Sequence, residues 1–311
     1  MGILHFITLG KSPGAATAGL SYLKNEKIHH PEKGSLVEGI ILFTSPEVHN
    51  GTEKVKECVW NEYMSMNSRK RWKDGNVVDI VSEFIKDEIG PIMDDKGTLY
   101  CCEVNPNDFD DCFKKLAHAT LRFSPPGKTG KHIWVNITGG TNIMNAAILE
   151  VTFLSGLIAK IYYTFISDLT YVKYLQPITR DRTKFGFGKV PIVKTKFDEP
   201  YYEVLRELKT LDREIKDEEL HSRLKNRLPN EFDKIAIGTF RREFINKMDG
   251  LYLKRKEPKG NEVFITDEGK SILKKLDDKL FKALIQRGKG EVNNIDELTK
   301  DLKLEKILVK K

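Results

Sequence analysis

Two short turns in the sequence combine glycine with small hydroxyl, amide and cationic side chains. The sequence GKSPG begins at Gly10 and TGGTN begins at Thr138, and each follows a short apolar run. Glycine lets a ligand approach the backbone closely, and a helix that starts after such a turn directs free N–H groups at the ligand. The chemistry of both turns therefore fits an anion such as a phosphate, together with the ribose that carries it.

Neither turn matches a motif for a common nucleotide cofactor. The chain contains no GxxxxGK[ST] sequence, and neither turn reads GxGxxG. A bound nucleoside triphosphate or dinucleotide is therefore not favoured, and no cofactor is expected. Either turn alone is typical of an ordinary connection from a strand to a helix, so it is the pair that points to a ligand.

The elements around the turns predict an open parallel sheet. Short apolar runs alternate with helical stretches, which is typical of βαβ units in a Rossmann-like α/β fold. In such sheets ligands bind at the carboxyl ends of the strands, so both turns should lie at one edge. The expected strands are 3–9, 37–43, 77–81, 98–104, 132–138 and 160–165, and a helix is expected at 51–66.

The second half of the chain predicts a different domain. Helical periodicity at 201–208, 217–228 and 237–248 precedes a β-pair at 251–255 and 262–265 and a helix capped by Thr266. Three helices, a basic hairpin and a closing helix predict an α+β winged-helix domain. The expected organisation is an α/β domain at 1–180, a linker at 181–198, the winged helix at 199–285 and a basic tail at 286–311.

Composition sets the broad class. The 311 residues are 40% hydrophobic and carry a formal net charge of +7, which permits phosphate or nucleic-acid partners without requiring them. Apolar stretches are too interrupted to span a membrane and no secretory signal is visible, so we expect a cytoplasmic protein. Buried thiols are expected rather than a metal site or disulfides, because no CxxC spacing occurs among Cys58, Cys101, Cys102 and Cys112.

Three features of the chain together resemble the CARF proteins, which sense cyclic oligoadenylate made by type III CRISPR systems. They are a first strand followed by GKSPG, a later strand followed by TGGTNIM, and a C-terminal winged helix. The resemblance implies a homodimer that binds one cyclic oligoadenylate across its twofold axis. Thr8, Thr138 and Asn145 are weaker candidates, and Asn145 points either into the pocket or into the sheet packing. The positions that match the ligand-binding turns are Gly10, Lys11, Ser12, Pro13, Gly139, Gly140, Thr141 and Asn142.

Within this family the chain is most similar to the standalone archaeal ring nucleases. The resemblance implies metal-independent cleavage of cyclic tetra-adenylate to linear di-adenylate with a 2′,3′-cyclic phosphate. Ser12 matches a serine that contributes to cleavage, whereas Asn142 stands where a lysine is often found. Either Lys11, Lys128 or Lys131 supplies the positive charge of that missing lysine, or turnover is slow. A HEPN ribonuclease is not expected, because His221 lies too far from Arg213 for that motif.

Two alternatives without catalysis remain. A cyclic-oligoadenylate-gated regulator would place the helix at 237–248 in the DNA major groove and the hairpin against phosphates. A sink would bind the messenger without cutting it. The candidate DNA contacts are Thr239, Arg241, Arg242 and Lys247 on the helix, and Lys254, Arg255, Lys256 and Lys259 in the wing.

Overall fold

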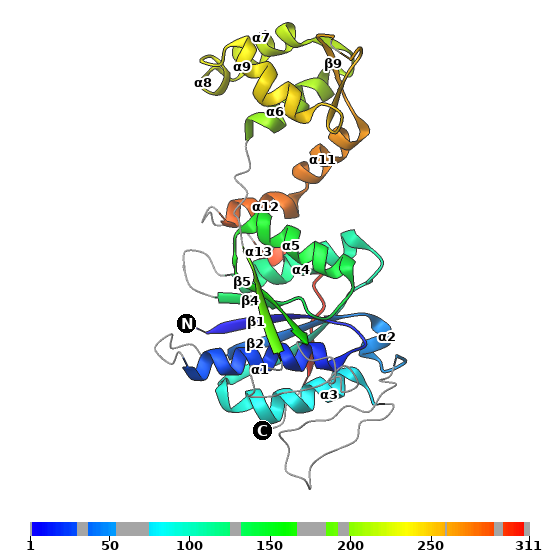
Figure 1. Cartoon of the computed structure of the whole chain (residues 1–311), viewed down its shortest axis with the longest axis vertical. Helices are drawn as coiled ribbons and strands as arrows, with labels where there is room; N and C mark the ends of the chain where they lie inside the picture. Colours follow the sequence, from blue (N-terminus) through cyan, green and yellow to red (C-terminus); the bar gives the residue numbers. More distant parts are fainter. Residues whose placement is uncertain are drawn as a thin grey trace. The chain divides into compact units, whose positions relative to one another are not determined.

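The computed structural model describes residues 2–29, 37–53, 75–124, 132–166, 185–191, 199–258, 260–288 and 295–307. The chain divides into two compact units (Figure 1). Unit 1 combines Met1–Lys194 with Ala283–Lys311, and unit 2 is Thr195–Lys282. Among the described residues, no helix combines the length and the apolarity needed to cross a bilayer.

Unit 1 is built on a mostly parallel sheet. Its strands within the described residues number seven, in the order β10-β3-β2-β1-β4-β5-β6. The five central strands run parallel, and an antiparallel strand closes each edge. The predicted Rossmann-like α/β fold is confirmed. The strands are β1 (Ile3–Leu9), β2 (Val37–Thr44), β3 (Met93–Glu103), β4 (His132–Asn136), β5 (Ile158–Ile166), β6 (Phe185–Val190) and β10 (Glu305–Ile307).

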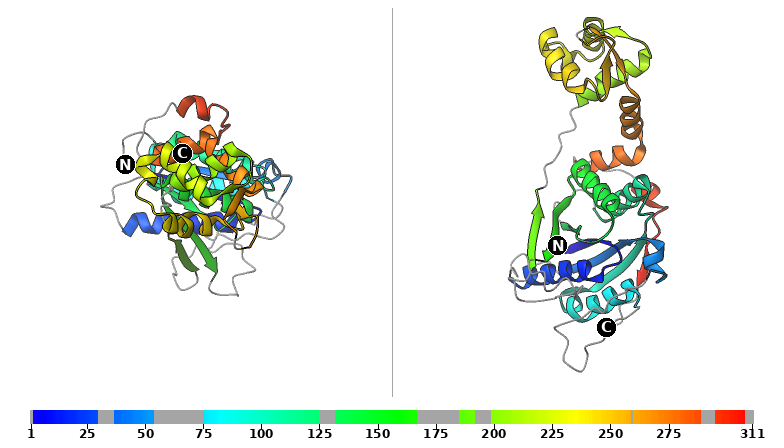
Figure 2. Two further views of the ribbon diagram at one scale, coloured as in Figure 1. Left: turned by 90° about the horizontal axis from the view of Figure 1, so that it is seen from above. Right: turned by 45° about the vertical axis from the view of Figure 1, so that its right-hand side comes forward.

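Helices cover both faces of this sheet, which keeps the central strands buried. In Figures 1 and 2, α1 (Pro13–His29) and α3 (Val77–Phe84) lie on one face, and α4 (Phe109–Phe123), α5 (Asn142–Ser155) and α13 (Ile295–Thr299) lie on the other. Every residue of β1 is buried, as parallel strands with two covered faces require. Shorter elements are α2 (Pro46–His49), the π-helical η3 (Ile85–Ile89), which continues α3, and the 3-10 helix η4 (Gly90–Ile92).

The order of the strands reverses between β1 and β4. From β1 the chain moves outward through β2 and β3, whereas from β4 it moves the other way to β5. β1 and β4 are direct parallel neighbours with Ile7 opposite Asn136, so their carboxyl ends lie side by side. Because α1 and α5 depart to opposite faces, a crevice forms at this topological switch point.

The predicted strand at 77–81 is wrong, because these residues begin α3. The Asn76 side chain caps the helix by accepting hydrogen bonds from the N–H groups of Val78 and Asp79. Asp79 is exposed, while its apolar neighbours and Phe84 are buried. A short apolar run fits a buried helix as well as a buried strand, and length and capping decide between them.

The predicted linker at 181–198 contains a strand of the sheet. Residues 185–190 form β6, which pairs antiparallel with β5. Gly188 makes room for the Tyr163 ring, since a Cβ there would lie 2.2 Å from the ring carbon Cζ. Phe187 stacks on Tyr22 at 4.6 Å between ring centroids. The alternating glycines that suggested a linker therefore allow a strand to pass close to aromatic rings.

The C-terminal segment, for which the sequence predicted no structure, is part of unit 1. It supplies α13 and β10, and β10 pairs antiparallel with β3. Arg287 of α12 (Lys279–Gly288) is buried and donates a hydrogen bond to the carbonyl oxygen of Ser124 at the end of α4. The expected helix at 51–66 falls mostly outside the described residues.

Unit 2 combines helices with a small antiparallel sheet whose strand order is β7-β9-β8. Its core contains Phe232, Phe240 and Phe244, with ring centroids 5.5–6.2 Å apart. Thr266 caps α11 through its hydroxyl, as predicted. The elements are α6 (Glu199–Leu211), β7 (Ile215–Lys216), α7 (Asp217–Arg227), α8 (Pro229–Phe232), α9 (Ile237–Phe240), the π-helical η6 (Arg241–Ile245), α10 (Asn246–Met248), β8 (Leu253–Arg255), β9 (Glu262–Ile265) and α11 (Asp267–Asp277).

Candidate anion-binding site at the ends of two strands

The two glycine turns are in direct contact at the switch point. A Cβ added to Gly10 would lie 3.4 Å from the backbone nitrogen of Gly140. A Cβ on Gly139 would lie 2.6 Å from the carbonyl oxygen of Thr8, and one on Gly140 would lie 2.7 Å from the Thr8 Cβ. Gly140 also has a φ of 73°, in the left-handed region that favours glycine. Glycine is therefore required where the turns touch.

Backbone N–H groups at this junction are unpaired. Those of Gly10, Lys11, Gly139 and Gly140 have no acceptor among the described residues. The turns lead directly into α1 and α5, whose N-termini carry partial positive charge. Donors converging from two adjacent turns form a surface suited to phosphate oxygens.

Thr8 and Asn145, both predicted as weaker ligand contacts, instead hold the glycine turn to the sheet. The Thr8 hydroxyl lies 2.9 Å from the carbonyl oxygen of Gly139 and 2.8 Å from Oδ1 of Asn145. The Asn145 amide donates to the carbonyl oxygens of Ile137 and Gly139, at 3.1 and 3.2 Å. Of the two orientations that its helical position allowed, Asn145 thus takes the one that packs against the sheet.

The hydroxyls of Thr138 and Thr141 also make internal hydrogen bonds. Thr138 donates to Oδ1 of Asn136 at 2.6 Å and accepts from the N–H of Thr164 at 2.7 Å. Thr141 donates to the carbonyl oxygen of Pro106 at 3.0 Å and accepts from the N–H of Met144, which caps α5. Both threonines therefore shape the turn rather than offer a free hydroxyl.

Ser12 and Asn142 are the predicted polar residues whose side chains stay available. Neither side chain makes a hydrogen bond to another described residue, and Asn142 is exposed at the first position of α5. Lys11 is exposed as well, but its ammonium lies 2.9 Å from Oε1 of Glu53. The alternative cations Lys128 and Lys131 lie outside the described residues.

Asn136 supports the second turn, a role that the sequence did not predict. It is fully buried at the end of β4, and its Oδ1 accepts from both the N–H and the hydroxyl of Thr138. Its Nδ2 donates to the carbonyl oxygen of Ala15 in α1 at 3.0 Å. One amide thus fixes the second turn against the helix that follows the first. The available signal was a lone amide ending the apolar run HIWVN.

A cavity of about 860 Å³ opens beside the two turns, and it too was missed. Gly10, Lys11 and Thr141 contribute to its lining, and most of the remainder comes from the end of β3, from the segments that follow β2 and β3, and from α4. Ser12, Gly139 and Asn142 are not among its lining residues. Five carboxylates also line it, those of Glu47, Glu53, Glu103, Asp108 and Asp111.

The charges in this cavity are largely paired. Lys115 binds Asp111 at 2.8 Å, and His49 binds Glu103 at 2.6 Å. Hydrogen bonds from its own backbone and from the Ser45 side chain, with a contribution from the Lys11 charge, lower the pKa of Glu47. Because carboxylates outnumber lysines, the cavity repels an isolated phosphate, whereas the unpaired N–H groups of the turns attract one.

The cysteines offer no reactive centre in the described part of the chain. Cys101, Cys102 and Cys112 are buried free thiols, as predicted, while Cys58 lies outside it. Burial raises the pKa of Cys101 and of Cys102 to about 12 and that of Cys112 to about 11, so all three are protonated at neutral pH. The described residues also contain no group of three or more His, Cys, Asp or Glu side chains arranged for a metal ion.

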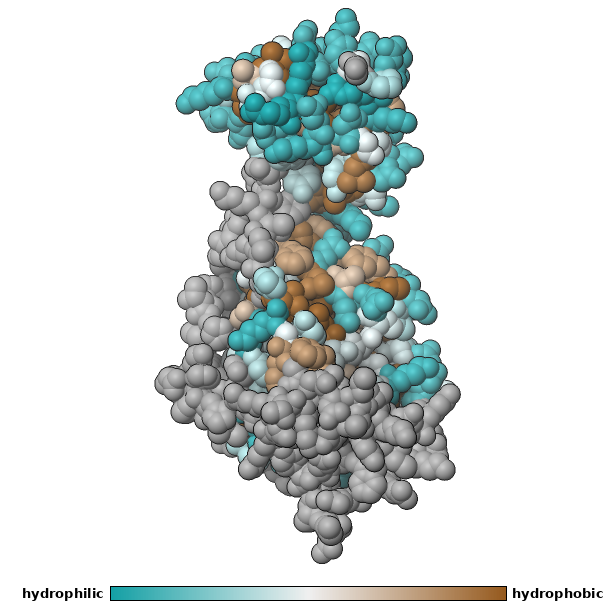
Figure 3. Space-filling model, in the orientation of Figure 1, coloured by the Kyte–Doolittle hydropathy of each residue, from teal (hydrophilic) through white to brown (hydrophobic). Residues whose placement is uncertain are grey.

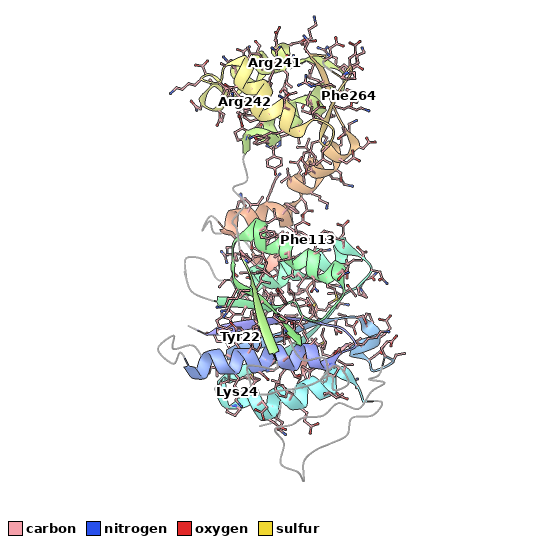
Figure 4. The ribbon with its side chains drawn as sticks, viewed as in Figure 1. Tyr22, Lys24, Phe113, Arg241, Arg242 and Phe264 are labelled. Carbon is pink, nitrogen blue, oxygen red and sulfur yellow. The ribbon has the colours of Figure 1, made fainter. Side chains whose placement is uncertain are left out.

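The arginines predicted to contact DNA are ion-paired within unit 2. Arg241 holds Asp217 through two hydrogen bonds of 2.7 and 2.8 Å, and Arg242 binds the neighbouring Glu243 at 2.7 Å. Figure 4 labels the two arginine side chains. Arg255 binds Asp249 and Asn246, at 3.1 and 2.8 Å.

The lysines on the same helix and wing differ in whether they have an acidic partner. Lys247 binds Glu243 and Lys256 binds Glu214, both at 2.6 Å, whereas Lys254 is exposed without a charged partner among the described residues. Lys259 lies outside them. The visible surface of unit 2 is mainly hydrophilic (Figure 3), yet much of its positive charge is already neutralised.

Replacing Arg241 by alanine is expected to lower the free energy of unfolding of unit 2 by about 2 kcal/mol, because it leaves a buried carboxylate without its partner. The Asp217 side chain is only 1% exposed, whereas that of Arg241 is 36% exposed. Because water reaches Arg241, the loss in the free energy of unfolding is smaller than for a fully buried pair. The measurement is urea denaturation of the full chain. The control is Arg242→Ala, whose side chain is 69% exposed; equal losses in both variants would contradict a structural role for the Arg241 pair.

His221 packs inside unit 2. It is buried, its ring stacks on Phe240 at 4.7 Å, and burial lowers its pKa. Arg213 binds Glu219 at 3.2 Å. The two residues thus make separate contacts within unit 2.

Comparison with known proteins found partial similarities. No family model matches it. An uncharacterized protein of Archaeoglobus fulgidus is 25% identical over 203 residues, covering 56% of this chain and 60% of that protein. Csm6 of Enterococcus italicus, solved bound to cyclic hexa-2′-fluoro-hexa-dAMP, has 16% sequence identity and a TM-score of 0.36 over 78% of this chain and 52% of the Csm6 chain. The chain therefore spans between half and two thirds of the length of each relative.

Proposed function

We propose that the protein binds a cyclic oligoadenylate at the junction of the two glycine turns. The observation that carries this proposal is the contact between the turns at the switch point, where unpaired N–H groups from both converge. The phosphodiester lies against these groups, and the adjoining cavity accommodates the nucleoside. A ring with repeating phosphates suits a homodimer, because a twofold axis would present the same donors twice.

The reaction that we propose is metal-independent cleavage of cyclic tetra-adenylate. A ribose 2′-oxygen attacks its own 3′-phosphorus, its proton is lost, and the bond to the 5′-oxygen of the next nucleotide breaks. That oxygen leaves with a proton as a 5′-hydroxyl, so two such cleavages give linear di-adenylates with 2′,3′-cyclic phosphates. The protein supplies alignment and stabilises the charge on the phosphoryl oxygens.

Three side chains have distinct roles in this proposal. Ser12, whose hydroxyl is available, orients the 2′-hydroxyl or binds a phosphoryl oxygen. Lys11 contributes the positive charge that Asn142 lacks, and Asn142 adds amide hydrogen bonds from the start of α5. Charge-assisted hydrogen bonds are the stronger kind, so Lys11 contributes more to stabilising the transition state than Asn142 does.

The test is an incubation of the purified protein with labelled cyclic tetra- and hexa-adenylate in EDTA, resolving bound, intact and cleaved species. Cleavage to linear di-adenylate is expected. Ser12→Ala should lower the single-turnover rate about tenfold to a hundredfold while the dissociation constant changes less than about threefold. An unchanged rate would remove Ser12 from the mechanism. Tight binding without cleavage would reduce the function to sensing or sequestration, and the absence of binding would overturn the proposal.

A further inference from the structure

Lys11 already has an anionic partner beside the turns where a phosphate would bind. Its ammonium lies 2.9 Å from Oε1 of Glu53, and both residues line the cavity. The second lysine of the lining, Lys115, is likewise bound to Asp111. An entering phosphate therefore meets no unpaired lysine among the described lining residues and has to compete for one.

Glu53 is presented to Lys11 by a defined turn. Its N–H donates to the carbonyl oxygen of Glu47 at 2.8 Å, which closes the segment after α2. The Asn50 side chain accepts from the N–H and the hydroxyl of Thr52, at 3.0 and 2.6 Å. Gly51 has a φ of 77°, and a Cβ there would lie 2.6 Å from the amide nitrogen of Asn76. The backbone carrying Glu53 is thus fixed between α2 and α3.

Glu53 and a ligand phosphate compete for Lys11 on nearly equal terms. The Lys11 and Glu53 side chains are 68% and 36% exposed, so water screens their attraction and a ligand can separate them. The unpaired N–H groups of the turns have no such competitor.

We propose that Glu53 is a positioning residue that holds Lys11 at the cavity and competes with the ligand phosphate for it. This inference rests on the proposed function, since it takes Lys11 as a phosphate contact. Glu53 keeps Lys11 in place without a ligand, releases it when a phosphate arrives and recovers it afterwards. It thereby weakens binding and favours release of the product.

The experiment measures dissociation constants of cyclic tetra-adenylate at low salt for the full chain and its variants. Glu53→Gln is expected to bind about two- to fivefold more tightly than the wild type, as loss of an exposed competing ion pair predicts. Glu53→Asp, which retains the charge, should stay within about twofold of the wild type. Asp110→Asn removes one charge from the exposed first turn of α4, outside the cavity lining, and controls for net charge.

A double-mutant cycle separates competition for Lys11 from simple repulsion. In a Lys11→Ala background, Glu53→Gln should change affinity less than about 1.5-fold, because the residue for which Glu53 competes is gone. Equal tightening with and without Lys11, or no tightening in either background, would overturn the role of Glu53 while leaving ligand binding intact. If the wild type binds no cyclic oligoadenylate, both this inference and the proposed function fail.

Discussion

Replacing Gly140 by alanine is expected to raise the dissociation constant for cyclic tetra-adenylate about a hundredfold. The residue has a φ of 73°, which costs an alanine conformational energy, and its Cβ would lie 2.7 Å from the Cβ and 3.0 Å from the hydroxyl of Thr8. Thr8 is buried in β1, so the turn has to move rather than the strand. The N–H groups of the second turn then no longer face those of the first.

The measurement is a binding titration together with thermal unfolding of the same variant. Gly250→Ala is the matched control, because Gly250 has a φ of 82° but nothing within 4 Å of its Cβ position. Both variants therefore carry the backbone cost, and only Gly140→Ala carries the contact with Thr8. If the two variants bound the ring equally well, the close approach of the turns would have no role in binding.

Replacing Asn136 by alanine is expected to lower the free energy of unfolding of unit 1 by about 3 kcal/mol. The substitution removes the acceptor for the N–H and hydroxyl of Thr138 and the donor for the carbonyl oxygen of Ala15. Asn136 is fully buried, so water does not replace these bonds. Affinity for the ring should fall as well, because the same amide fixes the second turn.

Chemical denaturation of the full chain, followed by hydrogen exchange at the Thr138 amide, checks this expectation. Asn226→Ala on α7, an exposed position, should change the free energy of unfolding by less than about 0.5 kcal/mol. A loss confined to stability, with normal affinity for the ring in the folded protein, would show that Asn136 supports the fold without organising the turn.

The sequence predicted the sheet and the pair of turns because those patterns are local. An apolar run that stops at glycine indicates a buried strand and its end, and β1 and β4 lie where those runs occur. The same local reasoning failed at 77–81, where only the Asn76 cap distinguishes a helix from a strand. It also failed at β6, whose glycines were explained only by the neighbouring Tyr163 ring.

The site was predicted less completely than the fold. Residue types identified the turns, but they did not distinguish a side chain that faces a ligand from one that supports the backbone. Thr8 and Asn145 bind each other and the turn, which depends on the pairing of β1 with β4. The carboxylates of the cavity come from segments after β2 and β3, which sequence places far from Gly10. Only tertiary contacts bring them together.

The antiparallel pairing of β10 with β3 has a consequence for the order in which the chain folds. Glu305 lies opposite Cys101, so the sheet of unit 1 gains its β10 edge only from residues that follow unit 2. During synthesis β3 remains an open edge while all of unit 2 is made, and closing so long a loop is slow. An open edge pairs readily with other chains. Residues made after unit 2 thus end the period in which the β3 edge of this sheet is open to such pairing.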